Sequence, residues 1–167
     1  MTSLVFRPET EADHAAIHRL TADAFAPMRF SDGTEPAIIR QLRARNELVL
    51  SLAAVQDGAL VAHVAFSPAR IADQPGYLVL GPLSVAPPLQ RRGIGSALVA
   101  DAIGRLRASG AKGVVVIGNP AVYGPMGFVG DRGLTCGDLP PALVQYMPLI
   151  APAPVPSGEV IFSPAFG

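Results

Sequence analysis

The 167-residue chain has no tryptophan, one cysteine and a single lysine. The lone Cys136 excludes an internal disulfide framework and any metal site built from several thiolates. No run reaches the roughly eighteen apolar residues that a membrane-spanning helix needs. The first residues have too short an apolar stretch, and acidic residues too early, for a secretory signal. We therefore expect a soluble, cytoplasmic protein with no membrane partner.

Charge is scarce and balanced, with 13 basic and 13 acidic residues and a formal net charge of +0. Nucleic-acid-binding proteins usually carry a basic excess, because phosphate contacts supply much of their affinity. We therefore expect no nucleic-acid partner. Hydrophobic residues make up 50% of the chain, which excludes intrinsic disorder. A chain of this mass buries about two-thirds of its unfolded surface, so we expect one domain over residues 1–167.

Apolar periodicity predicts a mixed α/β sheet. A capping box at Thr10–Asp13 opens a first helix, and a second helix begins near Glu35. The turn Asp57-Gly58 joins two apolar runs into a hairpin. A helix over Gly93–Ser109 connects two buried strands, and such a crossover requires a parallel pair. The expected strands are Leu4–Arg7, Leu48–Val55, Leu60–Phe66, Gly76–Val85, Lys112–Ile117 and two short ones in the tail.

A glycine-proline pair interrupts the regular pattern of this sheet. Gly81-Pro82 interrupts the longest apolar run, and proline donates no backbone hydrogen bond, so we expect a bulge or splay there. The ligand site of such a sheet is expected at the carboxyl end of the strand that enters the crossover helix.

The tail from Leu139 to Gly167 is too apolar for a disordered linker. It would either cap the monomer or serve a homodimer.

The segment QRRGIGSA, residues 90–97, is the most informative stretch for chemistry. Gly93 and Gly95 let the backbone turn tightly and approach a ligand without a Cβ in the way. The first amides of the following helix have no intrahelical acceptor, and the helix dipole favours negative charge there. This combination predicts a cradle for phosphate or pyrophosphate, with Arg91 and Arg92 at its rim. A glycine-rich turn that only starts an ordinary helix is the structural alternative.

Other phosphate and nucleophile motifs fit this segment less well. A dinucleotide fingerprint needs a third glycine where Leu98 stands, and a P-loop needs a lysine that does not follow. Ser96 lacks the glycines two residues to either side that a nucleophile elbow requires. His14 and His18 lie one helical turn apart, but no third ligand accompanies them, so a solvated helix face is the better interpretation.

The motif Gln90-x-x-Gly93-x-Gly95 follows the strand GPLSVAP and precedes the segment NPAVYGPMGF, residues 119–128. Together these motifs resemble the GCN5-related N-acetyltransferases, the GNAT superfamily, and the Pro-Ala-Phe ending resembles its YhbS-like branch. The resemblance is strongest over residues 76–130. It implies the GNAT (acyl-CoA N-acyltransferase) fold, an α/β fold with a mixed, mostly antiparallel central sheet whose central strands splay apart between flanking helices.

The same resemblance implies acetyl-CoA as acyl-donor cosubstrate and no metal. Amides of Arg91 through Ser96 would hold the pyrophosphate, and the backbone of residues 83–85 would pair with the pantetheine arm. The Val85 amide would donate to the thioester carbonyl, with Asn119 beside pantetheine and Tyr123 near the sulfur. The implied binding residues are Leu83, Ser84, Val85, Gln90, Arg91, Arg92, Gly93, Ile94, Gly95, Ser96, Asn119 and Tyr123.

Attack of an amine on a thioester places negative charge first on the carbonyl oxygen and then on sulfur. A fixed backbone donor stabilises the first charge, and a phenol can protonate the second. Tyr123 is therefore our candidate general acid, although it could instead simply pack a short helix. Glu35 and His63 are candidates for the base that takes the amine proton. The alternatives are a helix-dipole partner for Glu35, a packed histidine for His63, and a water chain in place of either.

These observations lead us to expect acetyl transfer to a primary amine by direct attack in a ternary complex, since no covalent nucleophile stands out. The acceptor, a small molecule or a protein amine, stays open. Two other classes also fit the cradle. One is a non-catalytic acyl-CoA-binding or sensing module, and the other is a nucleotide-binding domain.

Overall fold

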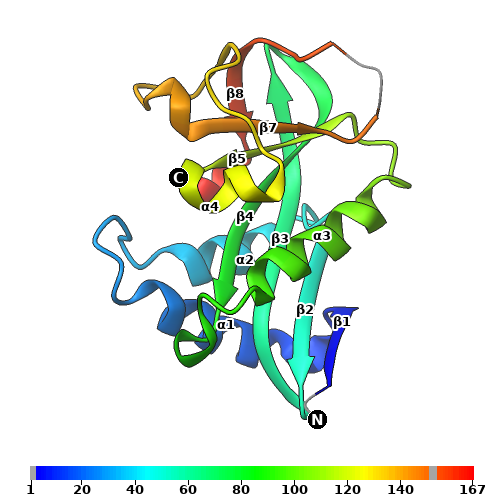
Figure 1. The fold of residues 1–167 in the computed structure, drawn as a ribbon, viewed down its shortest axis with the longest axis vertical. Coiled ribbons are helices and arrows are strands. Elements are labelled where there is room, and N and C mark those ends of the chain that lie inside the picture. Colours follow the sequence, from blue (N-terminus) through cyan, green and yellow to red (C-terminus); the bar gives the residue numbers. More distant parts are fainter. Residues whose placement is uncertain (1–2, 151–153) are drawn as a thin grey trace.

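The computed structural model describes residues 3–150 and 154–167 (Figure 1). Its strands pair in the order β1-β2-β3-β4-β5-β7, and β8 pairs with both β3 and β6. The strands are β1 Leu4–Pro8, β2 Leu50–Gln56, β3 Ala59–Ile71, β4 Gln74–Val85, β5 Gly113–Ile117, β6 Leu134–Thr135, β7 Val144–Pro148 and β8 Gly158–Phe162. The helices are α1 His14–Phe25, α2 Glu35–Ala44, α3 Ile94–Leu106 and α4 Pro120–Tyr123, with 3-10 turns η1 Glu11–Asp13, η2 Pro87–Leu89, η3 Gly124–Met126, η4 Pro141–Leu143 and η5 Pro164–Phe166.

Helices cover both faces of the sheet, with α3 on one face and α1 and α2 on the other (Figure 1). The alternation of side chains along β3 explains this layering. Ala62, Val64 and Phe66 belong to the apolar core that includes α3 residues such as Leu98. His63, on the opposite face, is 0% exposed. Both faces of β3 are thus buried, which fits its nearly continuous apolar sequence.

The structure confirms the predicted elements and shifts some of their ends. Thr10 N–H donates to Asp13 Oδ2 over 2.7 Å, so the capping box forms, but it opens the 3-10 turn that precedes α1. The crossover helix α3 ends at Leu106 before the expected Ser109, and Gly110 follows with a φ of +86°. β3 runs on to Ile71 because its end gains β8 as a second partner. The two-residue strand β6 was too short to predict.

The splay predicted at Gly81-Pro82 is present. The parallel pairing of β4 with β5 ends at Leu80 opposite Val116. Beyond that point β4 stays with β3, with a register shift in which Gly81 and Pro82 face Ala65. β5 stays with β7 through Ile117. The two central strands therefore diverge at their carboxyl ends, where α3 begins after β4.

The tail packs against its own chain. β8 pairs with β3 antiparallel and with β6 in parallel. Val160 and Phe162 join a second core with Ile71 and Val79, on the sheet face away from α3. Within residues 3–150 and 154–167, no helix has the length and apolar character to cross a membrane.

Candidate active site

A groove of about 820 Å³ opens at the splay. One side is formed by the β4 edge, the turn before α3 and the segment around α4. The other side is formed by the end of α1, the start of α2 and the end of the chain. The groove therefore reaches the gap between β4 and β5 from both faces of the sheet, as a two-substrate site requires.

The exposed edge of β4 offers free backbone donors to this groove. Ala86 N–H donates to the carbonyl of Val61 on β3 over 2.8 Å. Because donors alternate sides along an antiparallel strand, the amides of Val85 and Leu83 face away from β3 and into the gap. Gln90 Nε2 donates to the Val85 carbonyl over 3.0 Å, which fixes the turn to this edge. An extended ligand with amide groups can pair there as an added strand.

The start of α3 forms the predicted cradle. Gly93 is the N-cap residue and has a φ of +84°, in the left-handed region that glycine adopts without strain. Ala97 N–H donates to the Gly93 carbonyl over 3.0 Å and is the first amide of the helix to do so, so the amides of residues 94–96 have no intrahelical acceptor. A Cβ on Gly95 would lie 3.4 Å from Val85 Cγ2. The helix start therefore lies within van der Waals range of the strand edge.

Tyr123 lies at the end of α4, and its ring packs edge-on against Phe128 with 6.1 Å between ring centroids. The ring also covers Gly118, where an added Cβ would lie 2.6 Å from Tyr123 Cε2. Burial raises the pKa of the Tyr123 phenol, so it stays protonated at neutral pH. A protonated phenol facing the groove has the form that a general acid needs. Asn119 caps α4 by accepting a 2.9 Å hydrogen bond from Ala121 N–H.

The two candidate bases occupy very different places. Glu35 lines the groove, and Ser31 Oγ donates to its Oε1 over 2.6 Å. His63 is 0% exposed and does not line the groove. Its Nε2 lies 2.7 Å from Ser51 Oγ, and Ser51 in turn contacts Glu9. Burial lowers the pKa of His63 to about 4, so the imidazole is neutral at neutral pH.

Most of the predicted site residues meet at this groove: Glu35, Leu83, Val85, Gln90, Arg91, Gly93, Gly95, Ser96, Asn119 and Tyr123. Ser84 is buried on the other side of β4, and the Ile94 side chain points into the core. Arg92 and His63 are not part of the lining. Sequence reasoning missed the opposite wall, which includes Phe25, Met28, Phe30, Ile38, Leu139, Phe162 and Phe166. These residues lie far apart in the sequence and share no motif.

The family model of the acetyltransferase (GNAT) family matches residues 8–128. The chain belongs to the GNAT family. The uncharacterized N-acetyltransferase YhbS of Escherichia coli K12 is 31% identical over 108 residues, which cover 64% of this chain and 65% of YhbS. The uncharacterized N-acetyltransferase YjhQ of the same organism is 37% identical over 90 residues, or 50% of each chain. The matched segment thus spans less than two thirds of either curated relative.

Two solved GNAT structures match nearly the whole fold. A GNAT family acetyltransferase from Brucella melitensis, in complex with acetyl-CoA, has a TM-score of 0.86 and 34% identity, and 99% of each chain is covered. YhbS from Escherichia coli, in complex with CoA, has a TM-score of 0.91 and 26% identity, covering 99% of this chain and 93% of YhbS. The predicted GNAT fold and the resemblance to the YhbS-like branch are therefore confirmed.

Proposed function

We propose that residues 1–167 form one acetyl-CoA-dependent N-acetyltransferase domain, which moves an acetyl group to a primary amine by direct attack in a ternary complex. The observation that carries this proposal is the divergence of β4 from β5 directly beside the N-terminus of α3. One elongated ligand can there pair with a strand edge and place its diphosphate on free helix amides. CoA has this combination of groups.

The chain's own groups fit acetyl-CoA, which supplies the acyl group as a thioester. The amides of Ile94, Gly95 and Ser96 hold the diphosphate, and Arg91 adds positive charge beside them. The free amides of Leu83 and Val85 pair with the pantetheine arm. The complexes of the Brucella protein with acetyl-CoA and of YhbS with CoA support acetyl-CoA as the ligand.

In the reaction, the amine nitrogen forms a bond to the acetyl carbon, and the carbon–sulfur bond breaks with its electron pair going to sulfur. The Val85 amide donates to the carbonyl oxygen as negative charge develops there. Tyr123 gives its proton to the departing sulfur and is restored from solvent. As the tetrahedral intermediate collapses to the amide, the attacking nitrogen gives up one proton to solvent, which balances the proton that Tyr123 regains. Before attack the amine must already have lost another proton, since an alkylamine is mostly charged at neutral pH.

Glu35 is the candidate acceptor of that proton, because its carboxylate lines the groove. His63 could act only through intervening water, because it is fully buried away from the lining. Cys136 is not among the groove residues either, which supports direct attack over a covalent acetyl-cysteine.

The test is release of free CoA from acetyl-CoA in the presence of a broad panel of primary amines, combined with calorimetric titration of CoA. We expect micromolar or tighter binding of CoA and amine-dependent release. Tight binding with no release for any amine would instead identify a non-catalytic acyl-CoA-binding module. Absence of any binding heat with CoA and acetyl-CoA would overturn the proposal entirely.

A further inference from the structure

The groove has a second half that the donor does not explain. Val79 and Ile117 line the groove and belong to the core on the α1 and α2 side of the sheet. Leu80 and Val85 line it from the α3 side. The β4 edge therefore lies between two parts of one groove, a chamber on each face of the sheet. The chamber on the α1 and α2 side is where an acceptor can reach the gap.

The walls of this acceptor chamber are aromatic. Phe25 ends α1, and Phe30 lies on the loop before α2; both side chains line the groove. Phe162 and Phe166 face the chamber from the tail, with 5.5 Å between their ring centroids. The Phe30 side chain is 83% exposed. Apolar surface held open beside a reaction centre favours a ligand that removes it from water.

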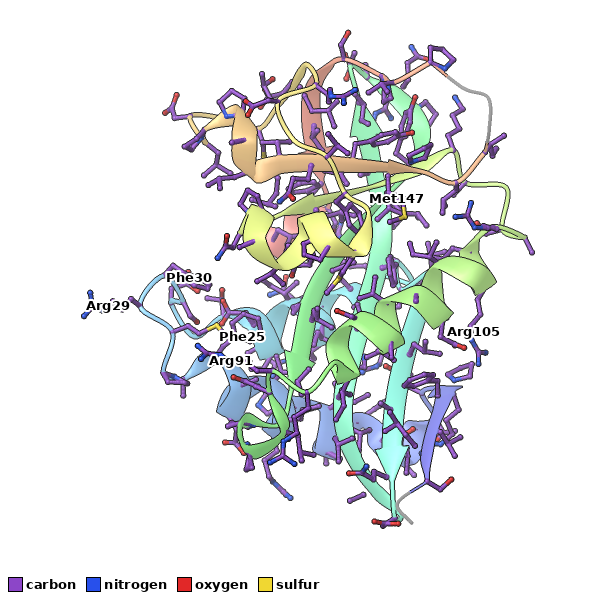
Figure 2. The ribbon with its side chains drawn as sticks, in the orientation of Figure 1. Phe25, Arg29, Phe30, Arg91, Arg105 and Met147 are labelled. Atoms are coloured by element: carbon purple, nitrogen blue, oxygen red, sulfur yellow. The ribbon has the colours of Figure 1, made fainter. Side chains whose placement is uncertain are left out.

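A single negative charge stands in this apolar wall. Glu35 is the only carboxylate among the described residues that line the groove. No ion pair joins Glu35 to a cation elsewhere in the described parts of the chain. Arg29, on the neighbouring loop, extends away from the body of the protein (Figure 2). Arg91 lines the donor side, at the cradle. The acceptor chamber thus complements one ammonium group.

We propose that the acceptor is a small primary amine carried on an apolar, aromatic body. Its ammonium group pairs with Glu35, and its body packs between Phe30 and the tail residues Phe162 and Phe166. This inference rests on the proposed function. The groove of about 820 Å³ also includes the residues assigned to the donor, so the space for the acceptor fits only a small molecule.

The other small amines fit this chamber less well. The carboxylate of an amino acid would lie near Glu35 with no cation on this side to neutralise it. A polyamine brings a second ammonium group, for which the lining has no second carboxylate. The hydroxyls of an amino sugar would lose water against phenylalanine rings without gaining hydrogen bonds.

The experiment compares kcat/KM for CoA release with 2-phenylethylamine, spermidine, glucosamine, phenylalanine and a short peptide with an apolar N-terminus. We expect 2-phenylethylamine to exceed each of the others by at least about tenfold, the ratio that corresponds to burying roughly one or two methylene groups. Calorimetry with 2-phenylethylamine and the CoA-saturated protein supplies a readout that is independent of turnover.

Two variants with matched controls locate the effect. Phe30→Ala should raise the KM for 2-phenylethylamine about tenfold and leave CoA affinity unchanged, whereas Val5→Ala, an exposed apolar change on β1, should alter neither. Glu35→Gln should weaken binding of 2-phenylethylamine to the CoA-saturated protein by at least about tenfold. Glu11→Gln, at the start of another helical segment, should have no effect.

The outcomes distinguish failure of the apolar-amine inference from failure of the proposed acetyltransferase function. Faster release with spermidine, glucosamine or phenylalanine than with 2-phenylethylamine overturns the apolar-amine inference and leaves the acetyltransferase function standing. Preference for the peptide overturns it in favour of a protein acceptor. CoA binding with no release and no 2-phenylethylamine heat overturns both.

Discussion

Tyr123 holds its place because Gly118 leaves room for its ring, and this contact could not be read from the motif. The motif marks the tyrosine, but the glycine that it covers directly follows β5 and was not singled out as a site residue. His63 shows the opposite relation. The sequence offered it as a base, whereas the structure buries it beside Ser51. The sequence named both residues as candidates for catalysis, and side-chain packing decides which of them reaches the groove.

Replacing Tyr123 by phenylalanine should lower kcat by about 100-fold, because the departing sulfur loses its proton donor. The affinity for acetyl-CoA should change little, since the ring still packs against Phe128. Steady-state kinetics and calorimetry measure the two quantities. Tyr77→Phe, outside the groove lining, is the matched control. An equal loss of affinity and rate would show that the tyrosine has only a structural role.

The change Gly118→Ala should displace the Tyr123 ring, because the new Cβ would lie 2.6 Å from Cε2. We expect a fall in kcat, with little further loss when Tyr123→Phe is added, since both changes remove the same group. Gly104→Ala is the control, because a Cβ there meets nothing within 4 Å. Full additivity of the two losses would contradict this account of Gly118.

Burial of His63 predicts a pH-dependent stability. Its pKa is lowered from 6.5 to about 4, so between these values the unfolded chain binds a proton that the folded protein does not. The free energy of unfolding should therefore fall as pH falls, by about 2 kcal/mol between pH 7 and pH 5 from this residue. Urea unfolding of the protein and of His63→Gln measures the difference. His18→Gln, on an exposed helix face, should keep the full dependence.

At the scale of elements, the site is a junction between the edge of β4 and the start of α3. The sequence predicted both elements, and the structure confirms their parallel crossover to β5. The sequence could not show which backbone amides face the gap, because their orientation depends on the pairing of Ala86 with Val61 across the sheet. Leu83 and Val85 share that orientation, and the resemblance to the GNAT family singles out the Val85 amide as the donor to the carbonyl.

This junction predicts the effect of a bulky side chain at Gly95. In Gly95→Leu the side chain would extend from a Cβ that already lies 3.4 Å from Val85 Cγ2, in the space between the helix start and the strand edge. The affinity for CoA should fall by about tenfold or more, as measured by calorimetry. Ala97→Leu, exposed on the same helix, should bind CoA normally. Unchanged binding in Gly95→Leu would place the donor elsewhere.

At the scale of the whole molecule, the chain brings its first third and its last residues to the same groove. Most strands of the sheet lie between the α1–α2 segment and the tail along the chain. Phe30 from the first segment and Phe166 from the tail nevertheless both line the groove. The tail could be predicted as two short strands. Its antiparallel pairing with the far end of β3 could not, because that pairing is set by long-range register.

Ligand binding at this junction should stabilise the entire fold. A ligand that binds only the folded state raises its stability by mass action, by about 2.7 kcal/mol at a hundred times the dissociation constant. Thermal unfolding should therefore shift upward with acetyl-CoA and much less with ATP at the same concentration, because ATP has no pantetheine arm to pair with the β4 edge. Equal or greater protection by ATP would favour a nucleotide-binding domain.

The sequence by itself determined the elements of the donor half: the strand ending at Val85, the glycine turn and the helix that follows. These features are local, since backbone conformation and free helix amides depend on neighbouring residues. Only the tertiary structure decided the acceptor half. Whether Glu35 faces a cation or an apolar wall, and whether Phe30 meets the tail across a groove, depends on contacts between distant segments. Such contacts arise from packing, which leaves no fixed spacing in the chain.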